Sequence, residues 1–194
     1  MLSRKRRVWY PGASYHITAR GNRRTALFEG KQDYLMYLAI LEDVRSIYPF
    51  TLHAYCLMTN HIHLQLQTKN VHIKEIMKEL HSRYAVWFNK EHHYTGHLFQ
   101  GRYGANVIDT DAYYVEVSRY IHLNPVEANM VHRPQDYRWS SYKAYISGTI
   151  DTHVTTTKVL AYFPQPRHIH YQAFVERKEK LDQVLEELKK WKPK

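Results

Sequence analysis

The sequence predicts an α+β fold in which an antiparallel sheet of the ferredoxin-like, split βαβ type carries helices on one face. The main observation is the order of hydrophobic patterns, which runs strand, helix, strand, strand, helix, strand through residue 108. A second observation is the stretch at residues 60–67, which alternates polar and apolar residues like a strand with one open side. The third is the length of 194 residues, which suits one domain with a core of its own.

The first strand and the first helix come from the N-terminal part of the chain. Residues 14–19 place three apolar side chains on one side, as expected of a strand. Apolar residues then recur three or four positions apart through residues 31–48, which predicts an amphipathic helix. Pro49 ends this helix, because the residue before a proline disfavours helical geometry.

The centre of the chain predicts a hairpin, a second helix and a fourth strand. Residues 50–57 form the second strand, and a short link leads into the strand at residues 60–67. The second helix covers residues 71–89, and the fourth strand covers residues 103–108. These elements complete the predicted sheet and the helices packed on it.

A third helix is predicted at residues 112–122, with residues 109–111 as its N-terminal cap. Tyr120 and Asn124 are four positions apart, so they share one face if the helix continues. Pro125 leaves two alternatives, because Asn124 either stays in this helix or caps a short new helix. In both cases Asn124 lies within one turn of Tyr120.

The remaining residues predict a C-terminal extension. Residues 134–145 are aromatic and polar and are expected to pack on the core. A helix start is expected at residues 155–157, and a final helix at residues 168–190. We therefore divide the chain into a core domain at residues 1–130 and an extension packed on it at residues 131–194.

Charge and composition restrict the partners of the protein. Lys and Arg number 28 against 18 Asp and Glu, and the resulting net charge of +10 predicts a polyanionic partner. No run reaches the roughly 18 apolar residues that a membrane span needs. The N-terminus also lacks the apolar stretch of a secretory signal. We expect a cytoplasmic protein with no membrane partner.

The clearest chemical signal is the pair His61 and His63, which point to the same side of one strand. Neutral imidazole is the commonest protein metal ligand, although two histidines that merely face solvent on an exposed strand would give the same pattern. With the amide oxygen of Asn124, the pair would hold Mg²⁺ or Mn²⁺ and leave positions open for phosphate oxygens. The phenol of Tyr120 would then attack phosphorus, although chemistry alone does not single it out among 17 tyrosines.

The end of the first strand offers a contact for phosphates. This segment consists of Arg20, Gly21, Asn22, Arg23 and Arg24. A solvated loop is the alternative, but the positive charge of the whole chain favours binding to a phosphate backbone.

Several motifs together resemble a known family. His61-Ile62-His63 is similar to the HUH motif of single-tyrosine transposases, which is histidine, bulky hydrophobic residue, histidine. Residues 119–126, Arg-Tyr-Ile-His-Leu-Asn-Pro-Val, resemble the catalytic helix of REP-associated tyrosine transposases within the IS200-like family. Further matches, at residues 10–16, 20–24 and 137–142, follow in the right order, so the resemblance covers most of residues 8–146.

The resemblance implies metal-dependent cleavage and rejoining of single-stranded DNA that forms hairpins, such as REP-like palindromes. It implies that Tyr120 forms a covalent 5′-phosphotyrosine and leaves a free 3′-hydroxyl. It also implies that His61 and His63 hold the metal, with Asn124 at the place where insertion-sequence relatives have glutamine. The residues implied in DNA contact are Arg20, Asn22, Arg23, Arg24, Gln100 and Arg102.

Two departures from the family pattern follow the predicted nucleophile. Relatives of this branch usually have a basic residue and then a glycine where Glu127 and Asn129 stand. An anionic Glu127 would weaken a phosphate contact there.

Two questions stay open in the sequence. Related sites are completed within one chain or between two, so we expect a monomer or a homodimer. The alternative function is a non-catalytic binder of single-stranded DNA or RNA with the same fold.

Overall fold

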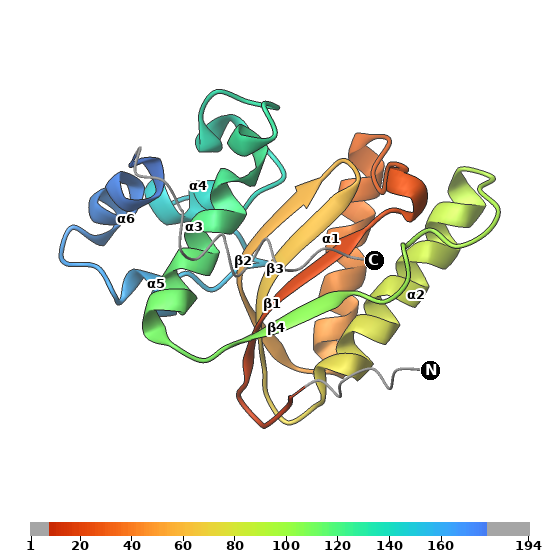
Figure 1. Ribbon diagram of the computed structural model, residues 1–194, viewed down its shortest axis with the longest axis horizontal. Coiled ribbons are helices and arrows are strands. Elements are labelled where there is room, and N and C mark those ends of the chain that lie inside the picture. The colour runs from red at the N-terminus through yellow and green to blue at the C-terminus, as the bar shows by residue number, and fades with distance from the viewer. Residues whose placement is uncertain (1–7, 178–194) are drawn as a thin grey trace.

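The computed structural model describes residues 8–177, where four strands form one antiparallel sheet in the order β2-β3-β1-β4 (Figure 1). The strands are β1 (Ser14–Arg20), β2 (Phe50–Met58), β3 (His61–Thr68) and β4 (Gly104–Ile108). The two central strands, β1 and β3, therefore carry neighbours on both sides. The predicted α+β fold is confirmed, and each strand lies within one residue of its predicted bounds.

Helices α1 (Lys31–Ile47) and α2 (Ile73–Glu91) cover one face of the sheet (Figure 1). Alternate strand residues such as Ile17 and Leu64 point to this face and are fully buried. Burying one such side chain contributes about 1.5–3 kcal/mol, so this layer is the main source of stability. Both helices lie within two residues of the predicted bounds.

Helix α3 (Asp111–Glu127) crosses the opposite face of the sheet (Figure 1), which differs from the predicted arrangement of helices on one face only. Its Val117 and Ile121 are fully buried in a second core together with Ala54 and Cys56 of β2. Helix α3 therefore covers the sheet face that carries the polar side chains.

Helix α3 runs through Pro125 without a break, so Asn124 belongs to it rather than to a new helix. The helix ends in a Schellman motif, in which Asn129 N–H bonds to Val126 O and Met130 N–H to Pro125 O, both at 2.9 Å. Asn129 has a φ of 54°, a conformation that asparagine tolerates better than most residues. It thus fills the position where relatives usually have glycine.

The segment after α3 pairs with the outer edge of β2. The N–H of Leu57 donates to the carbonyl of Trp139 at 2.9 Å, and the N–H of Ser141 donates to the carbonyl of Tyr55 at 3.1 Å. An exposed strand edge invites association with other chains, and this pairing covers it. The boundary at residue 130 stays a prediction, although residues on both sides of it share the second core.

Short helices complete the described part of the chain. They are η1 (Asn22–Arg24), η2 (Pro134–Asp136), α4 (Tyr142–Ile146), α5 (Thr157–Leu160) and α6 (Arg167–Glu176). Helix α5 begins at the predicted place. Helix α6 begins within one residue of the predicted final helix but ends at Glu176, because Arg177 is extended (φ −59°, ψ 139°), so the prediction of one continuous helix to residue 190 is wrong at this point. Residues 178–190 of the predicted helix lie outside the described residues.

The C-terminal segment anchors α3 through two buried polar side chains. The His122 ring lies 2.7 Å from the Tyr171 hydroxyl at Nδ1 and 2.8 Å from Ser141 Oγ at Nε2. Arg119 is only 2% exposed, and its guanidinium donates to the carbonyls of Val175 and Arg177. The helix is therefore held from outside as well as by the sheet.

His122→Ala should lower the free energy of unfolding by about 2–5 kcal/mol, as truncation of other large buried side chains does. The substitution leaves a cavity and removes both hydrogen bonds of the imidazole. Urea unfolding measures the loss, with the exposed Lys143→Ala as a control that should change stability by less than about 0.5 kcal/mol. Equal stability of the two variants would show that this anchor is dispensable.

Candidate active site

The sheet face beneath α3 carries a row of polar side chains. In β3, His61, His63 and Gln65 alternate with buried apolar residues, and the Gln65 side chain donates to an α3 carbonyl at 2.9 Å. Strand β1 runs antiparallel beside them, with Arg20 opposite His61 and Thr18 opposite His63. A guanidinium group therefore stands next to the first histidine.

Helix α3 places Tyr120 over these histidines. The Tyr120 ring centroid lies 5.3 Å from that of His63 and 5.6 Å from that of His16. The His61 and His63 centroids are 5.1 Å apart. Asn124 follows one turn later, and its Nδ2 donates to the Tyr120 carbonyl at 3.1 Å. The four residues predicted to form the reactive centre thus come together within one chain.

The two histidines are held in the neutral form. Burial, reinforced by Arg20, lowers the pKa of His61 to about 4, against a smaller opposing contribution from Asn124. Burial also holds the pKa of His63 well below its usual value, and the neighbouring His16 adds to this effect. Both imidazoles therefore keep a lone pair at neutral pH, which a metal ligand requires.

The Tyr120 phenol is held in its protonated form. Burial raises its pKa, while the side chain of Asn124 and the charge of Arg20 lower it in part. Glu127 adds a small further rise, so this departure from the family pattern acts against ionisation of the phenol. A reaction through the phenolate needs help in removing the proton.

His16 is a site residue that the sequence prediction missed. Its Nε2 lies 3.2 Å from His63 Nδ1, and the two rings are stacked at 5.4 Å. His16 thereby fixes the orientation of the His63 ring, as second-sphere partners of metal ligands do. The signal was present, because β1 alternates like β3 and puts His16, Thr18 and Arg20 on its polar side.

The arginine segment forms an exposed corner beside the site. Arg23 and Arg24 are exposed and have positive φ values of 52° and 64°. The turn needs Gly21, because a Cβ there would lie 2.0 Å from the carbonyl oxygen of Thr25. Arg20 alone of the three arginines lies beside the histidines.

Gln100 and Arg102 are also exposed, on the segment that precedes β4. The N–H of Gln100 donates to the carbonyl of Arg20 at 2.8 Å, which holds this segment against the end of β1. Arg102 and Asn22 line a separate pocket next to α2. The predicted DNA-contacting residues are therefore spread around the site rather than gathered in it.

The donors of the site fit a divalent cation. His61 Nδ1 lies 2.8 Å from Asn60 Oδ1, and because an amide oxygen only accepts, Nδ1 carries the proton and Nε2 keeps its lone pair. Within residues 8–177, no three His, Cys, Asp or Glu side chains converge as a metal site. The amide of Asn124 lies beside the imidazole of His61 and raises its pKa in part, against the larger effect of burial.

Comparison with known families agrees with this geometry. Residues 10–124, more than half of the chain, match the family model described as "Transposase IS200 like". This chain belongs to the IS200-like transposase family. The matched region of this IS200-like transposase contains all ten predicted site residues, from Arg20 to Asn124.

Two solved structures are similar to this IS200-like transposase. A REP-associated tyrosine transposase bound to a REP hairpin has 20% identity and a TM-score of 0.67, covering 79% of this chain and 92% of that one. A candidate transposase from Deinococcus radiodurans R1 has 21% identity over 61% of this chain and 95% of that one. Its TM-score of 0.42 is too low to carry an argument. The first of these likenesses supports the fold.

Two searches gave negative results, one among curated proteins and one for membrane-spanning helices. No curated protein matches the sequence. Among the helices of residues 8–177, none combines the length and apolar character needed to cross a bilayer.

Proposed function

We propose that this IS200-like transposase cleaves and rejoins hairpin-forming single-stranded DNA through a covalent phosphotyrosine at Tyr120. The observation that carries the proposal is the meeting of Tyr120 with two neutral imidazoles of β3 and the amide of Asn124. Residues far apart in the sequence thus supply a nucleophile and a set of metal donors at one place.

The phenolic oxygen of Tyr120 attacks a phosphorus atom of the DNA backbone. A bond forms between that oxygen and phosphorus, and the bond from phosphorus to the 3′-oxygen breaks. The phenol loses its proton and the departing 3′-oxygen gains one, which leaves a 3′-hydroxyl and a 5′-phosphotyrosine. Arg20, which lowers the pKa of Tyr120, favours the deprotonated phenol.

His61, His63 and Asn124 would hold Mg²⁺ or Mn²⁺. A divalent cation bound there supplies a Lewis acid for phosphate oxygens. The protein prepares this site by keeping both imidazoles neutral and by orienting His63 through His16. His63 then donates from Nδ1 to His16 Nε2, which leaves its own Nε2 for the metal.

The proposed substrate is a DNA hairpin of the REP type, bound by a monomer or a homodimer. The similar structure holds a REP hairpin, and the positive charge of this chain suits DNA. Completion of the site within one chain is favoured, because Tyr120 reaches His63 of its own chain. The second candidate function is a protein that binds single-stranded DNA or RNA without cleaving it, and it predicts that no covalent product forms.

The proposal is tested with single-stranded hairpin DNA that carries a label on the 3′ side of the cleavage point. A covalent product should appear as a labelled protein band in denaturing gels when Mg²⁺ or Mn²⁺ is present. Excess EDTA added before the DNA should prevent the band from forming. Mobility shifts without any labelled protein band, across both metals, would favour the binder.

Replacement of Arg23 and Arg24 by alanine should weaken DNA binding and flatten its dependence on salt. Each lost phosphate contact reduces the slope by about 0.7 for single-stranded DNA, because fewer counterions are released. Fluorescence anisotropy at several salt concentrations measures the slope. The exposed Arg133, which pairs with Asp136 at 3.0 Å, provides the control substitution Arg133→Ala. An unchanged slope in the double variant would remove both arginines from the binding surface.

A further inference from the structure

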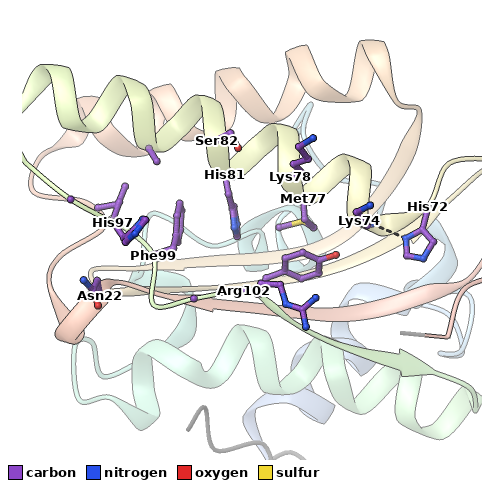
Figure 2. A pocket seen from close by; sticks show the side chains of 15 residues that line it. Asn22, His72, Lys74, Met77, Lys78, His81, Ser82, His97, Phe99 and Arg102 are labelled. Carbon is purple, nitrogen blue, oxygen red and sulfur yellow. Dashed lines mark hydrogen bonds between the residues drawn. The ribbon is translucent and has the colours of Figure 1, made fainter. Parts of the chain in front are cut away.

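A pocket of about 880 Å³ lies between α2 and the segment of residues 96–103 (Figure 2). This volume is within the range of small-molecule sites, which is about 300–1,000 Å³. The pocket lies on the α2 side of the sheet, whereas Tyr120 lies on the α3 side. None of its 15 lining residues is acidic.

Cationic side chains surround the pocket. Lys74 and Lys78 come from α2, and Arg102 lies on the segment before β4, on the other side of the pocket (Figure 2). All three are exposed, and Lys74 has a partner in Glu75 at 3.6 Å. The mouth of the pocket therefore attracts an anion such as phosphate.

The inner part of the pocket is aromatic and apolar. His81 stacks on Phe99 with ring centroids 4.1 Å apart and planes at 12°, and Tyr103 meets His81 edge-on at 6.2 Å. Met77 is fully buried beside them. Flat aromatic surfaces of this kind bind nucleobases by stacking, with little dependence on base identity.

His81 adds a polar atom that lacks a partner. Its Nε2 is buried and has no hydrogen bond to any described residue. Burial lowers the pKa of His81 to about 3, so the ring is neutral and has no charge to attract phosphate. A neutral imidazole suits a single hydrogen bond to the edge of a base.

The pocket wall is joined directly to the candidate active site. Asn22 N–H donates to the Leu98 carbonyl at 2.7 Å, and Gln100 N–H donates to the Arg20 carbonyl at 2.8 Å. Arg20 lies opposite His61 in the sheet. The end of β1 therefore connects the histidines with the wall of the pocket, although the two lie on different sides of the sheet.

We propose that this pocket binds an unpaired nucleotide of the single-stranded DNA substrate. Its base stacks against Phe99, and its phosphates contact Lys74, Lys78 and Arg102. The inference rests on the proposed function for the identity of the ligand, but it does not depend on the chemistry at Tyr120. It assigns to the α2 side of the molecule the binding of an unpaired base.

The test compares two fluorescein-labelled probes in a Tyr120→Phe background, where no cleavage interferes. One probe is oligothymidylate of roughly 12 nucleotides, within the usual site sizes of about 4–16, and the other is an abasic strand of equal length. Phe99→Leu should weaken binding of the first probe about fivefold or more and leave the abasic probe unchanged. Tyr162→Leu, at a 41% exposed tyrosine outside the pocket, is the matched control and should change neither.

A second variant protects the test against a folding defect. Lys78 is exposed, so Lys78→Ala should fold normally and should reduce the salt slope for both probes by about 0.7. Unchanged binding of oligothymidylate by Phe99→Leu, or an unchanged slope in Lys78→Ala, would overturn the pocket even if wild-type protein forms the phosphotyrosine. Loss of base preference without any phosphotyrosine in the wild type would instead support the pocket and reject the proposed chemistry.

Discussion

Tyr120→Phe should abolish the covalent protein–DNA product while DNA affinity changes by less than about twofold. The substitution removes only the phenolic oxygen, which is the atom proposed to attack phosphorus. The aromatic ring stays, so its contacts with His63 and His16 persist. Labelled hairpin DNA in denaturing gels measures the product, and anisotropy measures the affinity.

The matched control for this prediction is Tyr113→Phe. Tyr113 lies in the first turn of the same helix, seven positions before Tyr120 and therefore about 10 Å from it along the helix axis. This variant should form the covalent product at the wild-type rate. A product that survives in Tyr120→Phe and disappears in another tyrosine variant would assign the nucleophile elsewhere.

His63→Ala should remove cleavage and reduce Mn²⁺ affinity by more than the 10–100-fold that loss of a second-sphere partner typically costs. His63 is buried between His16 and Tyr120, so no other side chain replaces its imidazole. His61→Ala should behave in the same way, because His61 supplies the second neutral imidazole. Calorimetric titration with Mn²⁺ gives a readout that is independent of activity.

Affinity for DNA should remain within about threefold in both histidine variants, because phosphate contacts elsewhere carry most of the binding. His132→Ala, at an exposed histidine outside the site, is the control and should leave cleavage and Mn²⁺ affinity unchanged. Mn²⁺ affinity equal to that of the wild type in both His61→Ala and His63→Ala would exclude them as ligands.

The strands of the sheet could be predicted from the sequence because the alternation of polar and apolar residues is a local pattern. The alternation that defines β3 also fixes that His61 and His63 face the same way. By contrast, the sequence pattern did not predict which face of the sheet α3 covers. This helix buries polar residues such as Ser118, Arg119 and His122 on the side away from the sheet, so its apolar stripe is indistinct.

The choice of Tyr120 as the proposed nucleophile could not be made by physical reasoning from one sequence alone. Many of the tyrosines are buried structural residues; Tyr137 and Tyr145, for instance, donate hydrogen bonds to strand carbonyls. Tyr120 differs only through neighbours that lie about 60 residues away in sequence, in β3. Family resemblance supplied this long-range information, and His16 was missed because its partner, His63, lies on a neighbouring strand that is 47 residues away in the sequence.

The anchoring of α3 bears on how strands could be exchanged. Arg119 and His122, on either side of Tyr120 in the sequence, are both fastened to the C-terminal segment. A rotation of the helix that withdrew the phenol would break these hydrogen bonds and leave the buried guanidinium of Arg119 without the carbonyl acceptors of Val175 and Arg177, which costs free energy. If the proposed phosphotyrosine forms, we expect Tyr120 to stay in place during rejoining and the incoming 3′ end of the DNA to move to it.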